Sequence, residues 1–108
     1  MKLEDLVSYF REGNSYEDFC KQYSIDSQTE VIEVYMKKPF KLDSEIFFFE
    51  AEKTGDLIEY KFNDTLYYNL FDFYYFMDVI EESNESSNKN LKDLEIARVL
   101  LSYAIHDA

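Results

Sequence analysis

Carboxylates are the most abundant side chains in this sequence that could carry chemistry. The chain has 23 Asp and Glu residues among its 108. Glu50 and Glu52 would share one face of a strand, and Asp72 and Asp78 would lie on the outer side of a helix. A glycoside-cleaving pair needs two carboxyls about 5 to 10 Å apart in a cleft, in environments that separate their pKa values. At this density some pair meets any spacing by chance, so the carboxylates predict a solvated acidic surface.

The other reactive side chains predict no catalytic centre. His106 is the only histidine, and both catalytic triads and transition-metal sites depend on imidazole. Cys20 lies among apolar helix positions, which favours a buried structural thiol. Two glycines are too few for a phosphate-binding loop, and no EF-hand spacing is present. The sequence therefore predicts a protein that is not an enzyme and that needs no metal or cofactor.

Tyrosines set among carboxylates are the feature that points to binding. Four tyrosines between residues 67 and 75 cannot all face inward on one helix, and a tyrosine hydroxyl needs water or a partner. Tyrosine is enriched in interface hot spots, although ordinary surface aromatics are the alternative interpretation. We expect a surface for a basic partner made of Asp64, Tyr68, Asp72, Tyr75, Asp78 and Glu82.

Net charge narrows the classes of partner. The formal charge is −12 at pH 7 and the isoelectric point is about 4.3. Such a chain repels phosphate backbones, so we expect neither direct nucleic-acid binding nor docking onto anionic membranes. Residues 1–6 become charged at once, unlike a signal peptide, and no apolar run reaches the ~18 residues that span a bilayer. We expect a cytoplasmic protein.

The first elements that must position these residues are two short helices. Apolar residues at helical spacing predict a helix over residues 3–12, ended by Gly13. Ser15, followed three residues later by Asp18, matches a variant of the capping box that begins a helix. We therefore expect a small helical pair at the start of the chain.

β-branched and aromatic residues then predict an antiparallel sheet of about three strands. The expected strands cover residues 31–36, 45–52 and 57–62. Residues 53–56 are expected to join the last two strands as a hairpin, because Gly55 tolerates the positive φ of a tight turn.

Helical spacing returns after the strands. Residues 66–82 are expected to form a helix whose inner stripe is Leu70, Phe73, Tyr74, Met77 and Ile80. After a polar loop over residues 81–90, a final helix would turn Leu94, Ala97, Leu101 and Ile105 inward. The order predicts an α+β fold in one compact domain over residues 1–108, with helices before and after the sheet packed on one face.

The chain resembles the immunity proteins of bacterial toxin systems, such as those of contact-dependent growth inhibition. The resemblance is one of type over the whole chain, and it is carried by the charge of −12, the aromatic and acidic segment from Leu66 to Glu82, and the compact α+β pattern. It implies a stoichiometric inhibitor that binds a cytotoxic domain one to one, often a nuclease with a basic cleft.

Two other classes of function remain open at this point. One is an acidic nucleic-acid mimic of phage or plasmid origin, which regular carboxylate spacing along one face would favour. The other is a non-enzymatic adaptor subunit whose charge only maintains solubility. The sequence shows no regular carboxylate spacing, and it leaves the oligomeric state open.

Overall fold

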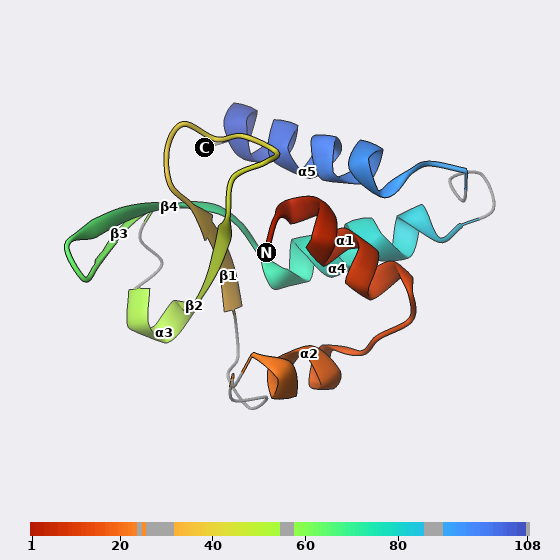
Figure 1. Ribbon diagram of the computed structural model, residues 1–108, viewed down its shortest axis with the longest axis horizontal. Coiled ribbons are helices and arrows are strands. Elements are labelled where there is room, and N and C mark those ends of the chain that lie inside the picture. Colours follow the sequence, from red (N-terminus) through yellow and green to blue (C-terminus); the bar gives the residue numbers. More distant parts are fainter. Residues whose placement is uncertain (24, 26–31, 55–57, 86–89, 108) are drawn as a thin grey trace.

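The structure is a computed structural model that describes residues 1–23, 25, 32–54, 58–85 and 90–107. It has the expected α+β fold, with helices before and after an antiparallel sheet (Figure 1). The elements are α1 (Leu3–Arg11), α2 (Tyr16–Gln22), β1 (Ile32–Met36), β2 (Ile46–Glu50), α3 (Ala51–Thr54), β3 (Glu59–Phe62), β4 (Thr65–Asp72), α4 (Phe73–Ser83) and α5 (Asp93–Asp107). No described helix is both long enough and apolar enough to cross a membrane.

The helical pair at the start of the chain is confirmed. The apolar residues of α1 are buried, and Gly13 after it has a φ of 99° that favours glycine. The Ser15 hydroxyl accepts a hydrogen bond from the Asp18 amide, and the Asp18 carboxylate accepts one from the Ser15 amide. These bonds cap the start of α2. Hydrogen bonding from Ser15 to the Asp18 carboxylate lowers the pKa of Asp18, because it stabilises the charged form. Cys20 of α2 is buried, as expected.

The sheet has four strands in the order β2-β1-β4-β3, with every neighbouring pair antiparallel. β1 is central and buried along its whole length. The register between β1 and β4 shifts between Val34 and Tyr35, which marks a bulge. The sheet therefore contains one strand more than the sequence suggested.

The sheet curls until its two edge strands meet through their side chains. The ring centroid of Phe49 on β2 lies 4.9 Å from that of Tyr60 and 5.6 Å from that of Phe62. Both of these residues are on β3, at the opposite edge of the sheet. Tyr35 and Tyr67 of the two inner strands contact the same Phe49 ring at 5.3 Å. The inside of the curl is thus a small aromatic cluster of its own.

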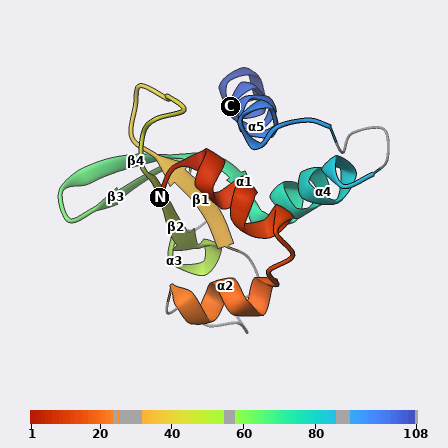
Figure 2. The ribbon, with the colours of Figure 1, turned by 45° about the vertical axis from the view of Figure 1, so that its right-hand side comes forward.

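The main core lies on the other face, where α1, α4 and α5 pack together and against the sheet (Figure 2). Phe76 of α4, Leu6 of α1 and Leu100 of α5 are fully buried there. At about 25 cal/mol per Å² of apolar surface, this burial is the main stabilising contribution. These helices hold β4 and the start of α4 in place.

The prediction of one helix over residues 66–82 is wrong in its first half. Thr65–Asp72 is strand β4, paired with both β1 and β3, and α4 begins at Phe73. Asp72 is the N-cap, where its carboxylate accepts a 2.8 Å hydrogen bond from the Tyr75 amide. The expected inward position of Tyr74 is also wrong, since 64% of that residue is exposed.

The expected hairpin over residues 53–56 is not supported by the sheet topology. β2 and β3 lie at opposite edges of the sheet, β2 ends at Glu50, and the chain enters α3. Gly55 itself lies outside the described residues. The tight turn lies instead between β3 and β4, at Asn63 and Asp64, whose φ angles are 49° and 64°.

The final helix is confirmed as α5, with a shifted inner face. Ile96, Ala97, Leu100, Leu101 and Ala104 are its buried residues, whereas Ile105 is 50% exposed. The expected inner stripe was one residue wide, so it missed Ile96 and Leu100, which lie beside Ala97 and Leu101 on a broader buried face.

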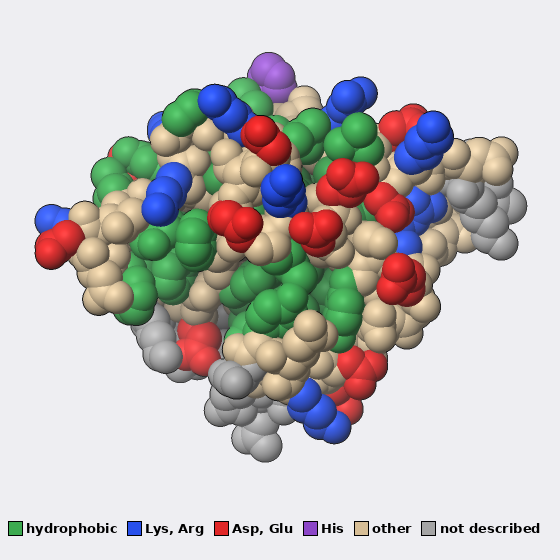
Figure 3. All heavy atoms as spheres, in the orientation of Figure 1, with side chains coloured by type: hydrophobic (Ala, Val, Ile, Leu, Met, Phe, Trp, Pro, Cys, Tyr) green, Lys and Arg blue, Asp and Glu red, His purple; other side chains and the backbone are tan. Residues whose placement is uncertain are grey.

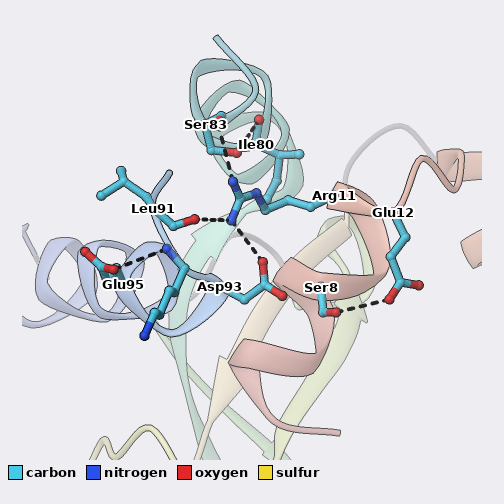
Figure 4. A network of polar contacts seen from close by, with 9 residues as sticks. Ser8, Arg11, Glu12, Ile80, Ser83, Leu91, Asp93 and Glu95 are labelled. Carbon is cyan, nitrogen blue, oxygen red and sulfur yellow. Dashed lines mark hydrogen bonds and ion pairs between the residues drawn. The ribbon is translucent and has the colours of Figure 1, made fainter. Parts of the chain in front are cut away.

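Arg11 connects helices α1, α4 and α5 through hydrogen bonds (Figure 4). Its guanidinium donates to the Leu91 carbonyl at 2.8 Å and to the Asp93 carboxylate at 3.0 Å, and it reaches the Ser83 carbonyl at 3.5 Å. These contacts join the end of α1 to the end of α4 and the start of α5. The open hollow of about 670 Å³ beside Arg11 is therefore part of a structural joint.

Candidate functional site

The six predicted partner-binding residues come from three places in the fold. Asp64 is exposed in the turn between β3 and β4, and Tyr68 lies half-buried on β4. The other four are the N-cap Asp72 and the α4 residues Tyr75, Asp78 and Glu82. The turn and the C-terminal end of α4 lie at opposite ends of the molecule in both ribbon views. One helix face cannot hold them all, so the expected single surface is divided.

A hollow at the start of α4 brings two of these residues together. β3 pairs with residues 65–68 only, and the hollow is lined by the residues of β4 that follow. Its volume is about 260 Å³. Its lining includes Glu33, Asn69, Asp72, Tyr75 and Tyr103. We call it the Glu33 hollow.

Glu33 gives this hollow a buried carboxylate. The residue is only 8% exposed, in the middle of β1. The Thr54 hydroxyl donates a hydrogen bond to it at 3.2 Å, and the Asn69 side-chain amide donates another. Both donors are neutral, and in the described part of the chain no Lys, Arg or His lines the hollow or pairs with Glu33. A buried carboxylate whose described hydrogen-bond donors are all neutral is a costly arrangement that suits a cationic group.

Aromatic rings form the wall of the hollow beside Glu33. Tyr75 of α4 stacks on Tyr103 of α5, with ring centroids 4.0 Å apart and planes 19° apart. Phe71 of β4 contacts Tyr75 at 5.9 Å. The negative faces of such rings attract cations, so the wall and the carboxylate favour the same kind of ligand.

A second hollow of about 270 Å³ adjoins the first, because Ile58 and Asn69 line both. It contains the predicted residue Tyr68, and the Lys38 ammonium lies 4.3 Å from the centre of the Tyr68 ring. Ile58 is 65% exposed at the junction of the two hollows, and Ile105 of α5 lines the second. Both hollows lie between β4 and α5, and we call the two together the β4–α5 groove.

The outer side of α4 is aromatic and acidic. The exposed residues Tyr74, Asp78, Glu81 and Glu82 define what we call the acidic face of α4. No Lys, Arg or His occurs between residues 73 and 85. Carboxylates in the last turn oppose the helix dipole, which favours cations there. The face thus carries negative charge at the end of the helix where the helix dipole makes negative charge unfavourable.

On the face drawn in Figure 3 the charges are mixed. Figure 3 shows one face of the molecule, on which acidic and basic side chains are interspersed around hydrophobic patches. An unbroken acidic surface would suit a nucleic-acid mimic, and that face does not provide one. The absence of basic residues from residues 73–85 is therefore a local property of α4.

The remaining reactive residues do not line either hollow. His106 is exposed near the end of α5, and Cys20 is buried in α2. Burial is the main cause that raises the pKa of Tyr16 above its ordinary value, and a hydrogen bond with Cys20 raises it further. Among the residues that the structure describes, no group of three or more His, Cys, Asp and Glu side chains could hold a metal ion.

No protein-family model, curated protein or solved structure matches the chain. The features that bear on function are therefore the β4–α5 groove, the acidic face of α4 and the net charge.

Sequence reasoning missed Glu33, Asn69, Tyr74 and Tyr103. One of them had a local signal, because Glu33 is a lone carboxylate within the apolar run from Val31 to Met36. Asn69 and Tyr103 had none, because only the packing of β4 against β1 and of α5 against α4 brings them to the hollow.

Proposed function

We propose that this protein is a stoichiometric inhibitor that binds a basic protein, in the manner of an immunity protein that neutralises a nuclease-type toxin. The acidic face of α4 is the observation that carries the proposal. In this proposal the complex is one to one, forms in the cytoplasm, and involves no catalysis and no cofactor.

Local energetics support a role for that face in binding. Each carboxylate near a helix C-terminus costs about 0.3 to 1 kcal/mol of stability at low salt. Glu81 lies in the last turn of α4, and that turn contains no basic residue. Lysines and arginines of a partner would remove this repulsion on binding. An exposed Tyr74 beside the acids adds the kind of ring that interface hot spots use.

The net charge supports fast capture of such a partner. A nuclease presents Lys and Arg to phosphates, and a protein of charge −12 is attracted to the same surface. Complementary potentials raise association rates toward ~10⁸ to 10⁹ M⁻¹s⁻¹ at low salt. A high association rate benefits an inhibitor that must bind a nuclease before the nuclease cuts its substrate.

The first test identifies the partner and its chemistry. The tagged protein is purified from its native host, and the bound protein is identified by mass spectrometry. We expect a basic protein whose toxic or nucleolytic activity is abolished at a one-to-one ratio. A bound partner that is acidic, or that keeps its activity in the complex, contradicts the proposal.

The second test measures association kinetics with that partner. The Debye length falls from ~30 Å at 0.01 M salt to ~8 Å at 0.15 M, so the association rate should fall over this range while dissociation changes less. Asp78→Lys and Glu81→Lys should weaken binding more than Asp43→Lys, which makes the same charge change in an exposed loop. Equal losses in all three variants would show that only net charge matters and would remove α4 as the binding face.

A further inference from the structure

We propose that the Glu33 hollow receives the guanidinium group of an arginine side chain from the basic partner. This inference rests on the proposed function, since it names the residue type that the inhibitor would capture. It concerns a site separate from the exposed acids of α4, and it depends on the burial of Glu33 and the rings beside it.

The carboxylate of Glu33 has acceptor capacity left for such a group. An ionised carboxylate offers about four lone-pair positions, and among the described residues Thr54 and Asn69 donate the two hydrogen bonds to Glu33. Asp72 lines the same hollow, and its carboxylate accepts the capping hydrogen bond from the Tyr75 amide. Two carboxylates with spare acceptors and no cation among the described lining residues form an electrostatically incomplete site.

The shape and wall of the hollow favour a planar cation. The stacked pair of Tyr75 and Tyr103 supplies ring surface next to the carboxylates. Guanidinium stacks on aromatic rings and binds carboxylates through two parallel hydrogen bonds, whereas an ammonium is a compact and strongly hydrated point charge. The hollow therefore distinguishes arginine from lysine by geometry.

Its size also suits a side chain. A volume of about 260 Å³ is several times the ~30 Å³ of one water molecule. It lies below the range of about 300 to 1,000 Å³ typical of pockets for whole small-molecule ligands. Ile58, exposed at the rim, would contact the aliphatic stem of the entering arginine.

The experiment titrates the protein alone with small probes, so it needs no partner. N-acetyl-arginine methylamide is added while amide NMR spectra are recorded, with the neutral citrulline analogue and the lysine analogue as matched probes. We expect saturable shifts at the Asn69 side-chain amide and at the backbone amides of Asp72 and Tyr75 with the arginine probe. The lysine analogue should bind more weakly, and the citrulline analogue should cause no saturable shift.

Variants locate the binding to the hollow. Glu33→Gln should weaken the arginine probe at least about fivefold, because a charge-assisted hydrogen bond is about twice as strong as a neutral one. Asp72→Asn should also weaken it while keeping α4 capped, since Asn is as good an N-cap as Asp. Asp43→Asn makes the same change in an exposed loop outside the lining and should leave the affinity unchanged.

Several results would overturn the inference. These are equal shifts with the citrulline analogue, tighter binding of the lysine analogue, or unchanged affinity in Asp72→Asn, which keeps the proposal testable if Glu33→Gln does not fold. The outcome is separable from that of the proposed function. A basic partner that binds through α4 while the arginine probe causes no shift removes the hollow alone, and an arginine-binding hollow in a protein without a basic partner removes the inhibitor role.

Discussion

At the scale of single residues, Phe73 shows how this protein uses its aromatic content. The first residue of α4 is buried, and its ring lies 5.2 Å from Phe19, 5.7 Å from Phe10 and 5.4 Å from Tyr16. It therefore links α4 to both helices at the start of the chain. Each such ring pair adds about 0.5 to 1.5 kcal/mol beyond the area it buries.

Phe73→Ala should lower the free energy of unfolding by ~3 to 5 kcal/mol, because it removes the whole ring from a close-packed cluster. Phe62→Ala is the matched control, since Phe62 is 45% exposed at the sheet edge and should lose clearly less. Urea denaturation of both variants measures the difference. If the two variants lose the same amount, the cluster around Phe73 is not the packed core described above.

At the scale of elements, the β3–β4 hairpin depends on its two-residue turn. Asn63 and Asp64 both have positive φ angles, as a type I′ turn requires, and Asp64 is exposed. The turn sets the register that pairs Phe62 with Thr65. Through it, the turn also fixes where β4 leaves β3 and where the Glu33 hollow begins.

Asp64→Gly should raise the free energy of unfolding by about 0.5 to 1 kcal/mol. A left-handed conformation costs a non-glycine residue roughly 1 to 2 kcal/mol, which glycine avoids. Glycine also gives the unfolded chain more conformational freedom, which reduces the gain in stability by about 0.4 to 1 kcal/mol. Asp64→Val should destabilise the protein, because a β-branched residue fits this conformation poorly. Thermal melts of both variants decide the matter, and a loss of stability in Asp64→Gly would contradict the account of the turn.

At the scale of the whole molecule, charge opposes compactness. The net charge is −12, and the ion pairs recorded among the described residues are the N-terminal amine with Glu45 and Arg11 with Asp93. Self-repulsion of an acidic chain destabilises its folded state. The aromatic cluster inside the curled sheet and the main core must hold the fold against it.

Raising NaCl from 0.01 to 0.15 M should therefore raise the melting temperature, since screening shortens the Debye length from ~30 to ~8 Å. The double variant Glu81→Gln, Glu82→Gln should gain less from added salt than the unaltered protein, because part of the repulsion is already gone. A melting temperature that falls as salt is added would show that attractive ion pairs outweigh the repulsion.

Much of the fold follows from local patterns in the sequence. α1, α2 and α5 lie where helical periodicity and the Ser15 cap predict them, and the α+β class follows from the change of period along the chain. The burial of Cys20 follows from its apolar neighbours. These features depend on contacts within a few residues, which a linear pattern records.

Tertiary structure alone decided that Thr65–Asp72 is a strand. The spacing of apolar residues from Leu66 to Ile80 is compatible with a helix. Residues 65–72 nevertheless form a strand, because they pair with β1 on one side and with β3 on the other. That choice also created the candidate site. Asn69 reaches Glu33 across 36 residues of sequence, and Tyr75 meets Tyr103 of another helix. Such a site depends on pairing between distant strands and on helix packing, which no local periodicity encodes.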